Sequence, residues 1–383
     1  MASIHWTEGE KSFDARWLSF SGAPAPARVV RVDGKLTADE AYGLACQGTA
    51  LMWRGDFQEA RQMLTALGNR ADRAQRKPRK SAAVAAAASP EAFNLYRQAR
   101  SQRARTLNAL LIPLDVDYTI PLRKAPDIRQ ACAEAFGPPE QTPSVASLRA
   151  LLGVIGAHEW RTKGIEVPAI GGRIHPHFGV FGPIRSEYVD LVNTAPLPAA
   201  ASSSSSVAFD IGTGAGVLAA VLAKRGIARV VATDLDPRAL ACARDNLERL
   251  QLSERVSVVQ ADLFPEGRAA LAVCNPPWIS ARPSSALENG IYDPDSRMLR
   301  GFLHGLPAHL EPEGEGWLIL SDLAEHLGLR TREQLLSEFE SAGLRVVDRH
   351  DVRPAHPRAA DKTDPLHAAR AAETTSLWRL ASR

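Results

Sequence analysis

The carboxyl-terminal half of the chain is predicted to be an α/β domain, with a parallel sheet covered by helices on both faces. Three observations predict it. From Val207 onward short apolar segments alternate with amphipathic ones, a glycine-rich turn follows the first apolar segment, and acidic residues follow the next two. Alternation of this kind is typical of βαβ units, whose strands run parallel. A ligand of such a sheet is expected at the carboxyl ends of its strands.

The individual elements follow from the spacing of the apolar residues. Asp236-Pro237 is a typical helix start, with a carboxylate as N-cap and a proline at the first helical position. The expected strands are 207–211, 229–233, 256–260, 271–274, 317–320, 344–349 and 376–380, with the last one able to complete the sheet as an antiparallel member. The expected helices are 216–225, 237–252, 297–310 and 332–342.

Residues 1–150 are predicted to form a mostly helical substrate-recognition module. Ala, Leu and Arg recur at helical spacing over 37–67, and 90–111 and 144–162 also fit helices. Ala50–Ala60 resembles one unit of a tetratricopeptide repeat, and without a second copy we interpret it as a helical hairpin. Residues 151–206 are expected to be a connector with a β-hairpin and a flexible Ser/Ala-rich linker at Ala199–Ser206, followed by the domain of residues 207–383.

Charge and cysteine usage restrict the class of protein. The net charge is +3, but between Leu51 and Leu110 twelve Lys/Arg stand against four acids. Such a segment either attracts phosphate backbones or is a solvated helix face with a basic linker. The four cysteines lie far apart without C-x-x-C spacing, which favours a reducing compartment. With no secretory signal pattern and no long apolar run, we expect a soluble, cytoplasmic protein with no membrane partner.

A glycine-rich turn opens the helix after the first predicted strand. Its sequence is Asp210-Ile-Gly212-Thr213-Gly214-Ala-Gly216. Glycines there permit a tight turn and a close approach of the backbone to a ligand. A dinucleotide fingerprint would require glycine at position 217, which is Val217. Asp234 ends the second strand, where a carboxylate can accept hydrogen bonds from both hydroxyls of a ribose.

At this point the chain resembles the class I S-adenosylmethionine (SAM)-dependent methyltransferases. The resemblance covers the last part of the chain and implies a Rossmann-like, seven-stranded sheet and SAM as cofactor. It further implies that Asp262 accepts a hydrogen bond from the adenine amino group and that Leu263 packs on the adenine face. The expected cofactor-binding residues are Asp210, Gly212, Thr213, Gly214, Gly216, Asp234, Leu235, Asp262, Leu263 and Asn275.

The sequence Asn275-Pro276-Pro277-Trp278 follows the fourth strand. In the family it resembles, this signature marks enzymes that methylate exocyclic amines of bases or the side-chain amide of glutamine. The resemblance implies that Asn275 Oδ1 and the Pro276 carbonyl accept the two N–H bonds of a planar amino group. Pro277 would stiffen the turn, and Trp278 would offer a flat surface for stacking. Catalysis would then rest on positioning and preorganised acceptors, and we expect no metal and no covalent nucleophile.

Gly179–Tyr188 resembles the segment that precedes the fold in release-factor glutamine methyltransferases and small-domain relatives. Phe181, Pro183 and Glu187 match it and are expected to bind substrate, although Gly182-Pro183 departs from the usual Arg-Pro or Glu-Pro pair. Glu288–Asp293 resembles the loop after the signature and is expected to form a substrate lid.

Two further signals are interpreted as structural features and not as functional sites. His175 and His177 are two residues apart on a predicted strand, but no third ligand accompanies them, so a metal site is not expected. Cys274 precedes the signature within an apolar strand and is expected to be a buried, inert thiol.

The sequence therefore predicts an N-methyltransferase acting on an exocyclic amino group of a nucleic-acid base, in particular adenine N6 or guanine N2 of ribosomal or other RNA. The target base would be turned out of its stack toward Trp278. The first alternative is methylation of glutamine N5 in a release-factor-like protein. An alternative of another class is an inactive RNA-binding protein with a methyltransferase fold, which the intact Asn275–Trp278 signature disfavours.

Overall fold

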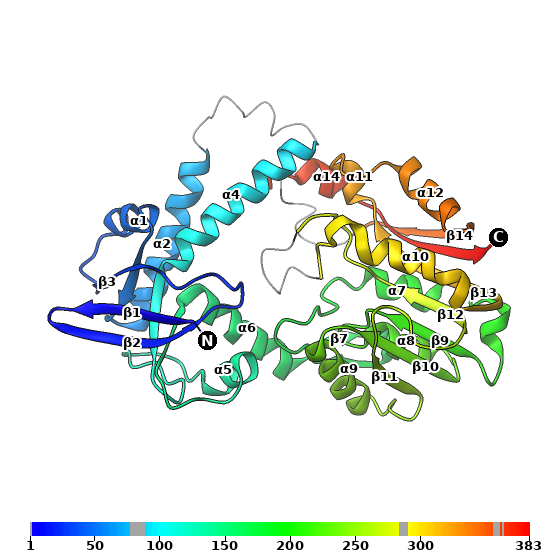
Figure 1. Cartoon of the computed structure of the whole chain (residues 1–383), viewed down its shortest axis with the longest axis horizontal. Coiled ribbons are helices and arrows are strands. Elements are labelled where there is room, and N and C mark those ends of the chain that lie inside the picture. Colours follow the sequence, from blue (N-terminus) through cyan, green and yellow to red (C-terminus); the bar gives the residue numbers. More distant parts are fainter. Residues whose placement is uncertain (1, 77–88, 283–289, 355–360, 362–363) are drawn as a thin grey trace. The chain divides into compact units, whose positions relative to one another are not determined.

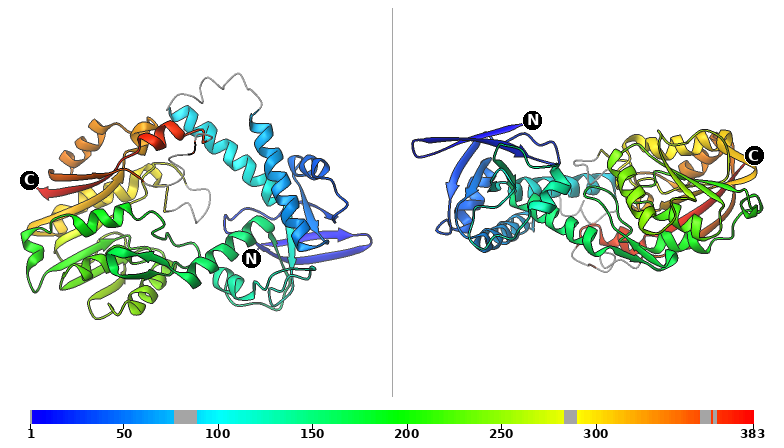
Figure 2. Two further views of the ribbon diagram at one scale, coloured as in Figure 1. Left: turned by 180° about the vertical axis from the view of Figure 1, so that it is seen from behind. Right: turned by 90° about the horizontal axis from the view of Figure 1, so that it is seen from below.

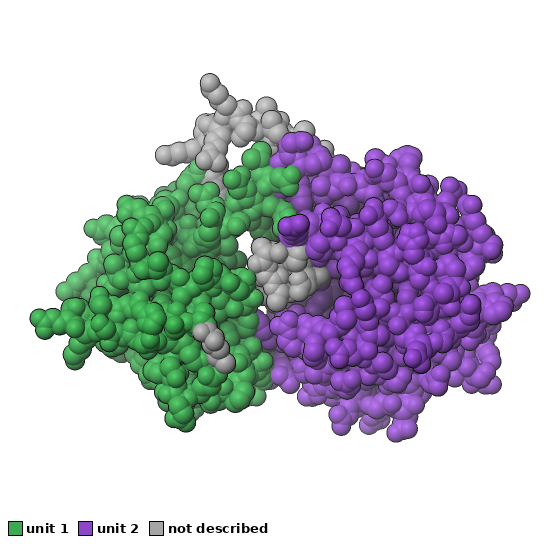
Figure 3. All heavy atoms as spheres, in the orientation of Figure 1, with its two compact units in different colours: residues 1–86, 94–159 green, residues 87–93, 160–383 purple. Residues whose placement is uncertain are grey.

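The computed structural model describes residues 2–76, 89–282, 290–354, 361 and 364–383. The chain divides into two compact units (Figure 3). The N-terminal unit comprises residues 1–86 and 94–159, and the C-terminal unit comprises residues 87–93 and 160–383. Among the described residues, no helix has both the length and the apolar character needed to cross a membrane.

The N-terminal unit is built on a six-stranded mixed sheet in the order β1-β2-β6-β5-β4-β3, so the prediction of a mostly helical module is wrong. Its strands are β1 (Ser3–Glu8), β2 (Lys11–Leu18), β3 (Arg28–Val32), β4 (Thr49–Trp53), β5 (Leu110–Leu114) and β6 (Ser144–Ser147). Its helices are α1 (Ala38–Cys46), α2 (Phe57–Arg76), α4 (Pro90–Asn108), α5 (Arg129–Phe136) and α6 (Leu148–Lys163), and both α4 and α6 extend into the second unit.

The error has a physical cause in the central strands of that sheet. Every residue of β4 and of β5 is buried, so each strand is a short continuous apolar run that lacks the alternation of a half-buried strand. A run of this kind cannot be distinguished from a buried helical turn by its period. The expected helical hairpin over Ala50–Ala60 is accordingly the end of β4, a short turn and the start of α2.

The C-terminal unit contains the predicted sheet, and its seven strands are confirmed in the order β11-β10-β9-β12-β13-β15-β14. The strands are β9 (Val207–Ile211), β10 (Arg229–Asp234), β11 (Val256–Gln260), β12 (Ala269–Cys274), β13 (Leu310–Ser321), β14 (Leu344–Val352) and β15 (Thr375–Ser382). The first five run parallel, whereas β15 is antiparallel to both of its neighbours, β13 and β14, as expected for the last strand. A short hairpin, β7 (Ile165–Val167) and β8 (Gly172–Ile174), precedes the sheet.

Helices cover both faces of this sheet (Figures 1 and 2). They are α7 (Glu187–Thr194), α8 (Val217–Lys224), α9 (Pro237–Arg249), α10 (Arg297–His309), α11 (Leu323–His326), α12 (Arg332–Ser341) and α14 (His367–Ala372). Successive residues of β12 point to opposite faces, as the pleat of a strand requires. Leu271 and Val273 join one apolar cluster, and Ala272 and Cys274 join the other.

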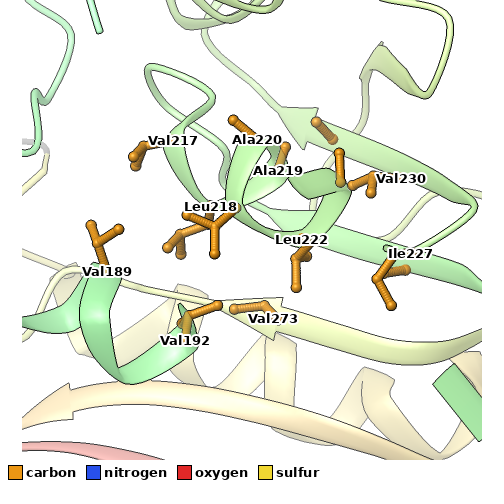
Figure 4. Packing of buried hydrophobic residues seen from close by; sticks show 14 of the residues in the cluster. Val189, Val192, Val217, Leu218, Ala219, Ala220, Leu222, Ile227, Val230 and Val273 are labelled. Carbon is orange, nitrogen blue, oxygen red and sulfur yellow. The ribbon is translucent and has the colours of Figure 1, made fainter. Parts of the chain in front are cut away.

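The first of these clusters holds the central strands against α7 and α8. Figure 4 shows Val192 of α7 and Leu218 of α8 packed near Val273 of β12, with Val230 of β10 alongside. Every residue of α8 from Val217 to Ala223 is buried, so this helix is enclosed on all sides and fixes the turn that precedes it.

The Ser/Ala-rich segment is attached to the domain at two buried residues, Ala201 and Ser206, whereas residues 202–205 between them are exposed, and its flexibility stays a prediction. It contains a short 3₁₀ turn, Ala199–Ser202, in which Ala201 is buried in the first apolar cluster. The carbonyl of Ser206 accepts a hydrogen bond from the backbone N–H of Arg229. The composition of this segment predicts flexibility, but strand β9 starts directly after Ser206, so the end of the segment is held at the core. Most of the other low-complexity stretch, 82–89, lies outside the described residues.

Candidate methyl-transfer site at the carboxyl edge of the sheet

The predicted site residues follow strands whose ends lie side by side. Ile211, the last residue of β9, is the Cα partner of Cys274 on β12 and of Thr233 on β10. Adjacent strands lie about 4.8 Å apart. The glycine turn, the Asp234 turn and the Asn275–Trp278 turn therefore start next to one another at the same edge of the sheet.

The glycine turn has positive φ angles, which residues with a Cβ atom rarely adopt. Gly212 and Gly216 have φ angles of 71° and 83°, in the left-handed region. A Cβ atom on Gly216 would lie 3.2 Å from Ala243 Cα of α9, so glycine also permits the close approach of these helices. A Cβ atom on Gly212 would lie 2.3 Å from Met298 Cε, which places Met298 over the turn.

Asp210 holds the turn together from inside. Its Oδ2 atom accepts hydrogen bonds from Thr213 Oγ1 at 2.6 Å and from the Ala219 N–H of α8 at 2.9 Å. The residue is 1% exposed, and this burial raises the pKa of its carboxyl group to about 6. The side chains of Asp210 and Thr213 thus bond to each other, which makes them supports of the turn, and their predicted contact with a cofactor stays a prediction.

Asp234 and Leu235 lie beside the glycine turn. Asp234 Oδ2 accepts from the Gly214 N–H at 3.0 Å, and its Oδ1 accepts from the Asp236 N–H at 2.9 Å. Burial raises the pKa of the Asp234 carboxyl group. The Leu235 side chain is 50% exposed, an uncommon position for an apolar residue next to a polar turn, and it is available to an apolar ligand surface.

Asp262 and Leu263 follow β11 and contact α10. The exposed Asp262 forms an ion pair with Arg297, in which the nearest N and O atoms are 2.5 Å apart. Leu263 has a φ angle of 73°, and its carbonyl accepts from Thr233 Oγ1 at 2.6 Å. Its side chain packs on α10, where a Cβ atom on Gly301 would lie 2.4 Å from Leu263 Cδ1. These contacts tie the β11 turn to the start of α10.

The signature turn contains a hydrogen bond that the sequence did not reveal. The indole Nε1–H of Trp278 donates to Asn275 Oδ1 at 2.9 Å. Pro276 is buried, whereas Asn275, Pro277 and Trp278 are half-buried. The oxygen that the family resemblance assigns to the substrate is therefore already held by Trp278 through one of its two lone pairs.

A buried ion-pair network lies against Trp278. The Arg185 guanidinium lies over the Trp278 ring at 5.1 Å from its centroid. Arg185 donates to Glu187 at 2.6 Å and to Glu373 at 3.1 Å, and Ser321 Oγ donates to Glu373 at 2.7 Å. The Glu187 side chain is only 9% exposed, so its carboxylate pairs with Arg185, and its predicted contact with substrate stays a prediction.

The remaining predicted substrate residues lie near the turn. Phe181 is 46% exposed and lies close to two glycines. A Cβ atom added to Gly214 would lie 3.8 Å from the Phe181 carbonyl oxygen, and one added to Gly290 would lie 3.2 Å from the Phe181 Cβ atom. Pro183 is buried and underlies this segment. Of the predicted lid, Glu288 and Asn289 lie outside the described residues. Its end is anchored by Asp293, whose carboxylate accepts from the N–H groups of Met298 and Leu299.

The two histidines and the cysteine to which the sequence analysis assigns no function, His175, His177 and Cys274, lie within the fold. His175 Nδ1 lies 2.6 Å from the Arg161 carbonyl, and His177 Nε2 lies 3.0 Å from Asp245 Oδ2. Cys274 is fully buried, as predicted, and burial raises the pKa of its thiol well above the usual value. A thiol in that state is a poor nucleophile.

Arg185 and Met298 are the site residues that sequence reasoning missed. Arg185 lies within the segment quoted for its resemblance, but nothing in its spacing indicates a contact with a turn almost a hundred residues later. Met298 is the second residue of α10, and its position over the glycine turn depends on how that helix meets the sheet. Asp293 belongs to the predicted lid, but its hydrogen bond with the Met298 N–H was not predicted.

The donor set at this edge fits SAM. Left-handed glycines offer a backbone cradle, Asp234 offers a carboxylate, and the exposed Leu235 offers an apolar surface. Among the described residues, no group of three or more His, Cys, Asp or Glu side chains is arranged to hold a metal ion.

Comparison with known proteins agrees with this geometry. Residues 173–342 match the family model of the methyltransferase small domain. The chain is 35% identical over 154 residues to a release factor glutamine methyltransferase of Cereibacter sphaeroides, covering 36% of this chain and 52% of that protein. It is 49% identical over 69 residues to a ribosomal protein L11 methyltransferase of Pelotomaculum thermopropionicum, covering 18% and 22%.

A third relative has another kind of substrate in its name. The chain is 28% identical over 191 residues to a tRNA1(Val) (adenine(37)-N6)-methyltransferase of Shewanella loihica, covering 47% of this chain and 74% of that protein. The chain thus spans about half the length of the release factor glutamine methyltransferase that it matches. Residues 173–342 are therefore similar to the methyltransferase small domain, and the strand order of the C-terminal unit agrees with the predicted seven-stranded, Rossmann-like sheet.

Proposed function

We propose that the chain is a SAM-dependent N-methyltransferase whose acceptor is a planar exocyclic amino group of a nucleic-acid base, in RNA. The observation that carries the proposal is the register of β9 with β12. Because Ile211 pairs with Cys274, the glycine turn and the Asn275–Trp278 turn begin on neighbouring strands. A methyl donor seated on one turn is then within reach of an amino group held by the other.

The residues of the signature turn supply positioning and acceptors. A planar amino nitrogen is a poor nucleophile because its lone pair is delocalised into the ring. Asn275 Oδ1 keeps one free lone pair after its bond with Trp278, and it accepts one N–H of the substrate. An acceptor fixed before the reaction favours the pyramidal nitrogen without reorganisation in the transition state. When bound, SAM supplies a methyl group activated by its sulfonium charge.

The choice of a nucleic acid rests on the basic residues of the N-terminal unit. Part of that charge is already neutralised inside the unit, because Arg54 pairs with Glu8, Arg70 with Asp39 and Arg103 with Asp72. Arg73 of α2 and Arg100 of α4 are both exposed, and Arg100 also donates to the Tyr96 hydroxyl at 3.3 Å. The Arg103–Asp72 ion pair joins the two helices, and both arginines lie within three residues of it in sequence. Lys77, Arg79 and Lys80 lie outside the described residues.

Glutamine methylation of a protein is the second candidate. The observation that favours it is the 35% identity to a release factor glutamine methyltransferase, which exceeds the 28% identity to the tRNA adenine-N6 methyltransferase. An amide nitrogen is planar for the same reason as a base amino group, so the turn serves both substrates equally.

Transfer of tritiated methyl groups from SAM separates the candidates. RNA and protein fractions from cells that lack the chain are each incubated with purified wild-type protein. We expect label in RNA, and digestion to nucleosides should yield N6-methyladenosine or N2-methylguanosine. Label confined to a protein of release-factor size would establish the glutamine alternative, and no label in any fraction would contradict the methyltransferase proposal.

A charge-reversal variant tests the basic helices separately. The double variant Arg73→Glu/Arg100→Glu should weaken binding of single-stranded RNA and lower the slope of log K against log salt by roughly one to two. The matched control Arg345→Glu reverses an exposed arginine on β14 of the other unit and should change neither quantity. An effect of Arg345→Glu about half as large as that of the double variant, in proportion to the charge each removes, would mean that only the overall charge matters.

A further inference from the structure

We infer that Arg185 is a positioning residue, which acts through Trp278 to fix the acceptor oxygen of Asn275. The effect on catalysis depends on the proposed function, but the contacts of Arg185, Trp278 and Asn275 do not depend on any substrate. Three side chains from two distant segments form the relay: Arg185 before α7, and Asn275 and Trp278 after β12.

The first step is the bond between Trp278 and Asn275. An indole N–H is a donor only, so the group that faces it at 2.9 Å is the carbonyl oxygen of the Asn275 amide. This bond determines which way round the amide is held. Without it, the amide could rotate by half a turn and present its NH2 group where the oxygen now lies, and an NH2 group cannot accept a substrate N–H.

The second step is the contact between Arg185 and Trp278. A guanidinium 5.1 Å from the ring centroid attracts the negative face of the indole and covers one of its two faces. Trp278 follows a Pro-Pro pair and is only half-buried, so the Arg185 contact restrains the plane of the ring. One face of Trp278 is therefore occupied by protein, and stacking of a substrate is limited to the other.

The third step is the restraint on Arg185 itself. Two nearly buried carboxylates, Glu187 at 9% and Glu373 at 3% exposure, bond its guanidinium. Glu373 is in turn held by Ser321, the last residue of β13, and lies two residues before the start of β15. The guanidinium is thus fixed by the sheet and not only by its own loop. The planar guanidinium of Arg185 bonds two carboxylates and stacks on a ring at the same time, and a lysine ammonium group cannot do both.

A double-mutant cycle tests whether Arg185 acts through Trp278. Removing the charge would leave two buried carboxylates unpaired, so the conservative variant Arg185→Lys is used. Trp278→Phe keeps a ring and deletes the N–H donor. We expect each single variant to lower kcat about five- to tenfold, with KM for the acceptor and Kd for SAM within about twofold of wild type. In the Trp278→Phe background, Arg185→Lys should lower kcat by less than about twofold, since the relay is already broken.

Additive effects on kcat would overturn the inference, because they would show that Arg185 acts by another route. The matched control is Arg349→Gln, since Arg349 also lies over a tryptophan, Trp378, at 5.0 Å but on the edge strand β14. It should leave kcat unchanged. A loss as large as that of Arg185→Lys would mean that any arginine–tryptophan contact in this unit acts through general stability.

A spectroscopic measurement keeps this test separate from the proposed function. In protein labelled with ¹⁵N in its seven tryptophans, the Trp278 indole N–H signal is assigned by its absence in Trp278→Phe. We expect Arg185→Lys to shift that signal and to speed its exchange with solvent, while the other indole signals stay in place. An unchanged Trp278 signal would refute the inference even if the enzyme is active. A shifted signal in a protein that methylates nothing would support the relay and reject the proposed function.

Discussion

Burial of Asp210 leads to a quantitative prediction about stability and pH. Its pKa is about 6 in the folded chain, against about 3.8 for an ordinary aspartate. A carboxyl group with a raised pKa stabilises the fold when it is protonated. Its contribution is fully present below pH 3.8 and is lost as the pH rises through 6. At about 1.4 kcal/mol per pKa unit, the total loss is about 3 kcal/mol, of which a little under half falls between pH 5 and 8.

The assay compares wild type with Asp210→Asn by urea unfolding at several pH values from 5 to 8. The asparagine oxygen can still accept from Thr213 and Ala219, but the side chain never ionises. The free energy of unfolding of wild type relative to the variant should fall by about 1 kcal/mol across that range. Asp262→Asn, at an exposed carboxylate, serves as control and should follow wild type. Parallel curves for wild type and Asp210→Asn would refute the reasoning from burial.

Two further predictions concern the turns themselves. Gly216→Ala should lower the free energy of unfolding in urea by about 3 kcal/mol, because φ at this residue is positive and the new Cβ would lie 3.2 Å from Ala243 Cα. The control Gly226→Ala also has a positive φ, but its Cβ would have nothing within 4 Å, so it should cost only about 1 to 2 kcal/mol. Equal losses would exclude crowding against α9. Asn275→Ala should abolish methyl transfer while leaving the Kd for SAM nearly unchanged; measurable turnover in this variant would remove Asn275 from the mechanism.

The catalytic fold could be predicted from sequence because its signals are local. The strands that carry the site, β9, β10 and β12, are short, mostly apolar runs that end at or just before a turn residue whose type matters: Gly212, Asp234 and Asn275. Strand ends of a parallel sheet meet at one edge, so the turns could be brought together without knowledge of side-chain contacts. Strand bounds differ most at β13, where the predicted 317–320 covers only the carboxyl-terminal part of Leu310–Ser321.

The N-terminal sheet and the orientation of carboxylates could not be predicted in this way. The runs Thr49–Trp53 and Leu110–Leu114 are buried on both faces and carry no period that separates strand from helix. Glu187 was assigned to substrate by resemblance, but its direction is set by Arg185, one of several polar residues in the same segment. The sequence places residues at an edge, whereas pairings such as Arg185 with Trp278 depend on tertiary packing.

A calorimetric titration of the full chain with SAM tests the central claim most directly. The account predicts a single site per chain with a micromolar Kd, and the same Kd for Asn275→Ala, because the glycine turn binds the donor and the neighbouring turn binds the acceptor. The absence of any binding heat, at two temperatures so that a zero enthalpy is excluded, would contradict it.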